Sequence, residues 1–183
     1  MLNQLLIFLL NTFVGLFILA LLLRFLVQAM RGPTRNPMYH FLAAITDWIV
    51  VPARRVIPGL WRTDLSTLVL AWAFQVVLLA ATFALRGAGV GIGALLLMGA
   101  LEIVKLLLYI LLFATIAQAV LTWVAPQSPA MPLLNSVTRP FLGPFQRRIP
   151  PVGNIDLSPI FLLVVIQILI FLLDYVAAFL FRL

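Results

Sequence analysis

One stretch of the sequence occurs twice, and the two copies lie 92 positions apart. Residues 46–67 and 138–159 are identical at eight of 22 positions, namely Thr46/Thr138, Pro52/Pro144, Arg55/Arg147, Ile57/Ile149, Pro58/Pro150, Asp64/Asp156, Leu65/Leu157 and Ser66/Ser158. Chance similarity between apolar segments does not keep two prolines, an arginine and an Asp-Leu-Ser triplet in register. The chain is therefore predicted to be an internal duplication, and its fold has to accommodate two copies of one unit.

Composition determines the environment of these two units. The chain of 183 residues is 64% hydrophobic and 9% charged, whereas soluble domains carry roughly 25% charged residues. A membrane span needs about 20 apolar residues, so the chain has room for about four. We predict an all-α polytopic membrane protein.

Four long apolar runs are predicted to cross the membrane, at about residues 5–30, 65–85, 103–124 and 157–180. The first is expected to remain as a span, because no cleavage pattern follows a short apolar core. Two shorter runs, residues 38–51 and 131–141, are apolar on one helical face only. They are predicted to lie in the interface as amphipathic helices. Pro52 is expected to end the first of them.

The units are expected to be tandem and parallel, because a unit that crosses twice returns to its starting side. We predict a first repeat over residues 1–86, a glycine-rich hinge over 87–93 and a second repeat over 94–183. The loops after the first and third spans contain eight arginines, against about three basic residues on the other side. By the positive-inside rule, both long loops should be cytoplasmic and both termini outside the cytoplasm.

Each long loop contains a basic, proline-rich segment, which we call the first elbow (residues 52–66) and the second elbow (residues 144–159). Their candidate contact residues are Pro52, Arg54, Arg55, Pro58, Asp64 and Ser66 in the first, and Pro144, Arg147, Arg148, Pro150, Asp156, Ser158 and Pro159 in the second. Prolines rigidify the reversal into the next span, and arginines bind lipid phosphates at about 1 kcal/mol each. The elbows either anchor the topology on anionic lipids or dock a cytoplasmic partner; nucleic acid is not favoured.

Five polar residues fall within or near the predicted spans, namely Arg24, Gln75, Gln118, Gln167 and Asp174. Arg24 is expected to extend its guanidinium to the interface, and Gln118 lies near the corresponding place in the second repeat. Gln75 and Gln167 match at the offset of 92, so they either form interhelical hydrogen bonds or line a polar pathway. Asp64 and Asp156 are expected to pair with loop arginines or with Arg24, and Asp174 either approaches Arg86 or reaches water.

The duplicated block, best developed as Pro144-Phe-Gln-Arg-Arg-Ile-Pro-Pro-Val-Gly-Asn-Ile-Asp-Leu-Ser-Pro159, resembles that of the YggT family of small bacterial and plastid membrane proteins. The first copy departs from the motif, because Thr67 replaces its last proline. The resemblance implies a bacterial inner-membrane protein without established catalytic activity. It also implies themes of osmotic or potassium homeostasis, of envelope or division-linked organisation, and, for plastid relatives, of cytochrome maturation or nucleoid placement.

Three function classes follow. The first is a non-enzymatic scaffold or assembly factor whose protein partner is unidentified, and the alternative is a small channel or transporter subunit that works as a homo-oligomer. The third class, an enzyme, is not expected. The sequence has no cysteine and a single histidine, His40, which leaves no catalytic triad or zinc site. No cofactor and no metal are expected.

Overall fold

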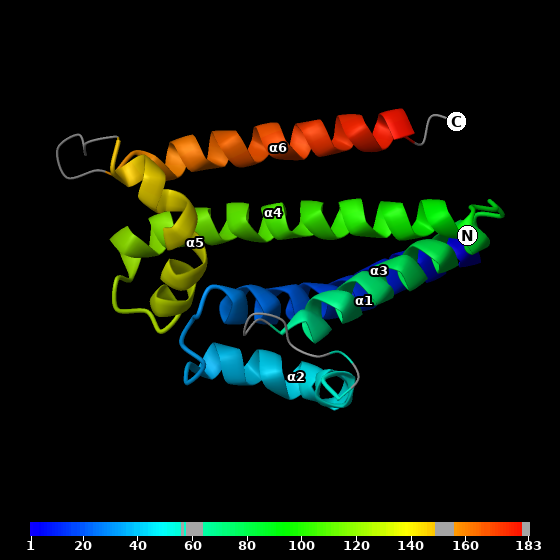
Figure 1. Ribbon diagram of the computed structural model, residues 1–183, viewed down its shortest axis with the longest axis horizontal. Helices are drawn as coiled ribbons and strands as arrows, with labels where there is room; N and C mark the ends of the chain where they lie inside the picture. The colour runs from blue at the N-terminus through cyan, green and yellow to red at the C-terminus, as the bar shows by residue number, and fades with distance from the viewer. Residues whose placement is uncertain (56, 58–63, 149–155, 181–183) are drawn as a thin grey trace. The chain divides into compact units, whose positions relative to one another are not determined.

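We describe a computed structural model of the chain over residues 1–55, 57, 64–148 and 156–180. The elbow residues Pro58, Arg62, Ile149 and Pro150 lie outside these described residues, as does Arg182. Within the described ranges the chain forms six α-helices in the order α1 (Leu2–Ala29), α2 (Pro37–Ala53), α3 (Leu65–Leu85), α4 (Ile92–Val124), α5 (Met131–Gln146) and α6 (Ser158–Leu180), which Figure 1 labels.

Helices α1, α3, α4 and α6 are long and apolar enough to cross a membrane. They correspond to the four predicted spans, which confirms the all-α polytopic fold. Helix α4 has 33 residues, so it is about 50 Å long at 1.5 Å per residue. Helix α4 begins at Ile92, well ahead of the span predicted at residues 103–124.

The two interfacial helices are longer than the sequence predicted. Pro52 was expected to end α2, but it lies inside the last turn of that helix, which continues to Ala53. Pro140 and Pro144 likewise lie inside α5. A proline removes one backbone donor from a helix. Pro52 and Pro144 lie near the ends of their helices, where this loss interrupts no long ladder of hydrogen bonds.

The chain forms two compact units, each made of two separate stretches. The first unit comprises Met1–Phe25 and Phe41–Leu106, and the second comprises Leu26–His40 and Leu107–Leu183. All three boundaries between the units fall inside helices, since α1, α2 and α4 each contribute residues to both units. The two units are described separately below.

In the first unit, α1 packs on α3, and α3 packs on the first half of α4. The Phe17 ring of α1 meets the Phe74 ring of α3 edge-on at 5.1 Å between centroids. The Trp72 indole of α3 donates to the backbone carbonyl of Leu96 in α4 at 3.1 Å. Helix α4 approaches α3 closely at Gly99, where an added Cβ would lie 2.6 Å from the Val76 side chain.

In the second unit, α5 packs against α6 (Figure 1). The buried residues of α6 recur every four positions, at Ser158, Leu162, Ile166 and Ile170, and form one stripe along the helix. Helix α5 buries Leu133, Val137, Thr138 and Leu142.

The end of α1 is closed by a Schellman motif, in which the Gly32 N–H donates to the Val27 carbonyl and the Arg31 N–H to the Gln28 carbonyl. The left-handed residue is Arg31, with φ of 54°. Gly32 serves close packing instead, because an added Cβ would lie 2.7 Å from the Ser136 hydroxyl of α5.

Candidate functional site

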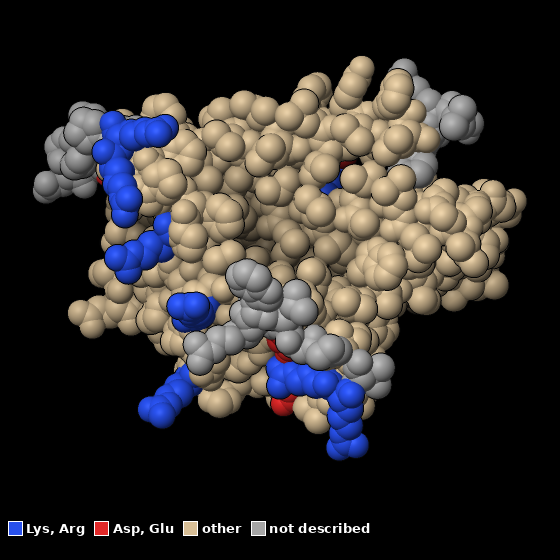
Figure 2. All heavy atoms as spheres, in the orientation of Figure 1, with Lys and Arg blue, Asp and Glu red and all other residues tan. Residues whose placement is uncertain are grey.

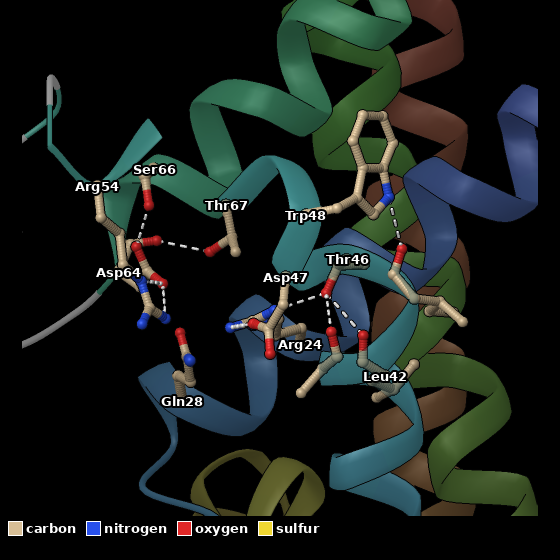
Figure 3. A network of polar contacts seen from close by, with 12 residues as sticks. Arg24, Gln28, Leu42, Thr46, Asp47, Trp48, Arg54, Asp64, Ser66 and Thr67 are labelled. Atoms are coloured by element: carbon tan, nitrogen blue, oxygen red, sulfur yellow. Dashed lines mark hydrogen bonds and ion pairs between the residues drawn. The ribbon is translucent and has the colours of Figure 1, made fainter. Parts of the chain in front are cut away.

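The first repeat joins α1 to α2 through a buried arginine. Arg24 is 2% exposed; its Nη1 donates to the Thr46 hydroxyl at 2.6 Å, and its Nη2 lies 2.7 Å from the Asp47 carboxylate. Figure 3 shows both α2 residues facing the guanidinium. The Thr46 hydroxyl in turn donates to the Leu42 carbonyl at 2.6 Å. We call these three residues, Arg24, Thr46 and Asp47, the first clasp.

The Arg24 guanidinium reaches α2, the helix predicted to lie in the interface, and Asp47 of that helix provides its counter-charge. A buried charge needs such a partner. The Asp47 side chain is 49% exposed, so only one member of the pair has been removed from solvent.

The first elbow is held by an ion pair at the start of α3. Arg54 Nε donates to the Asp64 carboxylate at 2.7 Å. The same carboxylate accepts a hydrogen bond from the Ser66 hydroxyl, and the Thr67 hydroxyl donates to the Asp64 backbone carbonyl at 2.6 Å (Figure 3). A carboxylate placed just before a helix also interacts favourably with the positive end of the helix dipole. Of the two partners that the sequence left open for Asp64, the structure selects the loop arginine.

The second repeat builds the same two contacts without an arginine. The Thr138 hydroxyl donates to the Gln118 amide oxygen, and the Gln118 amide nitrogen donates to Asn135 at 2.7 Å. Gln118 therefore does correspond to Arg24, as its place in the sequence suggested. We call this contact the second clasp. Thr138 also donates to the Leu134 carbonyl at 2.8 Å, as Thr46 does to that of Leu42.

At the second elbow, Gln146 and Asp156 occupy the places of Arg54 and Asp64, each 92 positions further on. The Gln146 amide donates to the Asp156 carboxylate at 2.9 Å, and the Ser158 backbone N–H donates to the same group at 2.8 Å. Burial alone would raise the pKa of Asp156, but the hydrogen bonds from Ser158 and Gln146 outweigh it and hold the pKa below its usual value. Asp156 therefore stays ionised at neutral pH.

The two repeats thus share geometry and differ in charge. Two ion pairs, Arg24–Asp47 and Arg54–Asp64, are present in the first repeat, whereas in the second repeat Gln118 and Gln146 occupy the places of the two arginines. Asp47 is replaced by Arg139 at the offset of 92.

The remaining predicted residues fall into three groups. Arg55, Arg147 and Arg148 are exposed beyond the ends of α2 and α5. Gln75 is buried in α3, whereas its counterpart Gln167 is exposed on α6, so the two glutamines have different surroundings. Asp174 is exposed on α6.

Sequence reasoning did not select Asp47, Thr46, Thr138 or Gln146 as site residues. The constant offset of 92 finds Thr46 and Thr138, which are identical. It does not find Asp47 or Gln146, whose counterparts are Arg139 and Arg54. Within the described residues, no three His, Asp or Glu side chains gather as metal ligands would. Most atoms on the face shown in Figure 2 belong to uncharged residues, from which the basic side chains project.

Six helices with four apolar spans, two interfacial helices and two matched elbows define a multi-pass membrane protein made of two tandem helical hairpins. The family model described as CCB3/YggT matches residues 3–85 and 97–177. The chain therefore belongs to the CCB3/YggT family, and the two matched segments agree with the duplication.

Several bacterial proteins are similar along nearly their whole length. An uncharacterised protein of Pseudomonas aeruginosa is 38% identical over 172 residues, which cover 92% of this chain and 87% of the relative. An uncharacterised Vibrio alginolyticus protein is 31% identical over 169 residues, 91% of each chain. The uncharacterised protein YggT of Escherichia coli is 28% identical over 163 residues, 88% of this chain and 85% of the relative. No solved structure matches the chain.

Proposed function

We propose that this protein is a non-enzymatic scaffold or assembly factor of the bacterial inner membrane, and that its two elbows hold a protein partner at the cytoplasmic surface. The observation that carries the proposal is that each elbow is fixed at both ends. A clasp ties the preceding interfacial helix to a span, and Asp64 or Asp156 ties the elbow to the start of the next span. The exposed arginines Arg55 and Arg147 lie next to these anchored positions, which suits a docking surface because anchored backbone loses less conformational entropy on binding.

The surfaces of the spans support the same role. In the most apolar windows of the four spanning helices, between 17 and 28% of the residues are buried. The rest of this apolar surface has to be covered by lipid or by other membrane proteins. A protein that gathers neighbouring membrane components has use for such surfaces.

Orientation is the first part of the proposal to test, and the absence of cysteine from the sequence makes the test direct. Single cysteines introduced as Arg55→Cys, Arg147→Cys and Gly89→Cys are labelled in intact spheroplasts with a membrane-impermeant maleimide. We expect only Gly89→Cys to react from outside, and the two elbow positions to react after the membrane is opened. Reaction of either elbow cysteine from outside would contradict the cytoplasmic placement.

The docking role is tested by photo-crosslinking in cells. A photoreactive amino acid beside each elbow arginine should capture a discrete set of proteins. Arg55→Ala combined with Arg147→Ala should abolish these adducts without lowering the amount of protein in the membrane. Arg86→Ala, which removes a basic residue outside both elbows, is the matched control and should leave the adducts unchanged. Adducts that survive the double substitution would reduce the elbows to lipid anchors.

A further inference from the structure

The second elbow carries a carboxylate without the arginine that its counterpart has. Arg54 pairs with Asp64 in the first elbow, whereas Gln146 occupies the arginine's place beside Asp156. No ion pair to Asp156 is present within the described residues, and the sequence of residues 149–155 contains no Lys or Arg. Gln146 donates a hydrogen bond but does not neutralise the charge, so Asp156 keeps its negative charge.

A cavity of about 290 Å³ opens beside this carboxylate, and its lining includes Gln118 and Trp123 of α4, Gln146 of α5, Asp156, and Pro159 of α6. Its polar groups are the Asp156 carboxylate, the Thr122 hydroxyl and the amides of Gln118 and Gln146. Trp123 is 72% exposed, and tryptophan at such a place is typical of the headgroup level of a membrane. Its ring face also attracts cations. The cavity therefore suits a small cationic group that enters from the lipid side.

Basic residues lie on the other side of Gln146. A second cavity, of about 460 Å³, is lined by Arg139, Arg147 and Gln146 together with Pro140, Gly143 and Pro144 of α5. Gln146 lines both cavities, so a negative site and a positive site meet at a single side chain. A ligand that spans them has to carry an amine and a phosphate separated by a short linker.

We propose that the second elbow binds the headgroup of an aminophospholipid of the phosphatidylethanolamine type. Its ammonium donates to Asp156 and to the side-chain oxygen of Gln146, and its phosphate contacts Arg139 and Arg147. A primary ammonium offers N–H donors that a choline headgroup lacks, and an anionic glycerol headgroup has no cation for the carboxylate. The inference does not rest on the scaffold role, because lipid selectivity is measured without any protein partner.

The test is native mass spectrometry of the purified, delipidated full-length chain. The protein is titrated with an equimolar mixture of phosphatidylethanolamine and phosphatidylcholine that carry the same acyl chains, one of them deuterated. We expect the first bound lipid to be phosphatidylethanolamine by about tenfold, the effect of one charge-assisted hydrogen bond. Stepwise N-methylation of the headgroup should lower this preference step by step.

Two variants probe the site in different ways. Asp156→Asn removes the charge, and Gln146→Arg supplies the guanidinium that the first elbow already has; each should bring the preference close to one. Asp64→Asn is the matched control, because that carboxylate already pairs with Arg54, and it should keep the preference. Size-exclusion chromatography selects the folded fraction of each variant before measurement.

Equal binding of the two lipids by the unmodified chain would overturn the proposal. So would a preference that survives both Asp156→Asn and Gln146→Arg. The proposal would also be refuted if the protein bound phosphatidylglycerol more strongly than phosphatidylethanolamine and this ratio were the same in Asp156→Asn. That result would mean that the arginines alone select the lipid.

Discussion

The two members of the first clasp are predicted to differ in what their removal costs. Arg24 is 2% exposed, whereas the Asp47 side chain is 49% exposed. Asp47→Asn therefore leaves a buried guanidinium without its counter-charge. Breaking a buried pair in this way costs about 3–5 kcal/mol of unfolding free energy.

Arg24→Met should cost much less. Methionine fills the space of the arginine stem, and water can solvate the carboxylate that remains. Thr46 keeps its hydrogen bond to the Leu42 carbonyl, and Arg24 Nε, which has no hydrogen-bond partner among the described residues, is removed. We expect a loss of about 1 kcal/mol, the net value of one hydrogen bond. The double variant should resemble Arg24→Met alone, so the coupling energy should equal the cost of Asp47→Asn in magnitude, about 3–5 kcal/mol.

The assay is SDS-induced unfolding in mixed micelles, followed by far-UV circular dichroism. Gln118→Met in the second clasp is the control, because it removes only neutral hydrogen bonds and should cost about 1 kcal/mol or less. If Arg24→Met proves as costly as Asp47→Asn, the pair stabilises the fold through its charges, and the reasoning from unequal burial is wrong.

Two further predictions concern packing and pH. Gly99→Ala should lower the unfolding free energy by about 1–3 kcal/mol because Val76 blocks an added Cβ. The control Gly93→Ala, whose Cβ would meet nothing within 4 Å, should be neutral or stabilising by up to about 1 kcal/mol. The SDS assay compares the two variants, and equal costs would contradict the close approach of α4 to α3 at Gly99. The lowered pKa of Asp156 means that its ionised form stabilises the fold above the ordinary value of 3.8, and that this contribution disappears as the pH falls through the folded-state pKa. Unfolding measured against pH should show this acid-side loss in the unmodified chain and not in Asp156→Asn, and parallel curves would contradict it.

The fold could be predicted from the sequence because it depends mainly on patterns among residues that are close together in the chain. Apolar length predicts spans, and the spacing of apolar residues predicts the interfacial helices. The predicted end of α2 at Pro52 was wrong, because a proline near a helix end costs less free energy than one in the middle. None of these predictions requires knowing which helices are in contact.

The clasps could not be predicted in the same way. Arg24 and Asp47 lie on different helices, and their pairing depends on how α2 packs on α1. The sequence alone therefore did not indicate Asp47 as the partner of Arg24. Likewise, Gln75 and Gln167 match in sequence but differ in exposure, because α3 and α6 bury different faces. Equal positions in a duplicated sequence need not have equal neighbours.

The course of α4 has a consequence for dividing the molecule. Its first residues, up to Leu106, complete the first compact unit, where Leu96 accepts the hydrogen bond from the Trp72 indole. If the gene were cut at the glycine-rich hinge, the N-terminal fragment would lack α4. The C-terminal fragment would contain α4 without α3, which packs on its first half in the whole chain. We expect the two fragments to accumulate only when they are co-expressed. In that case each helical hairpin would depend on the other copy for its stability.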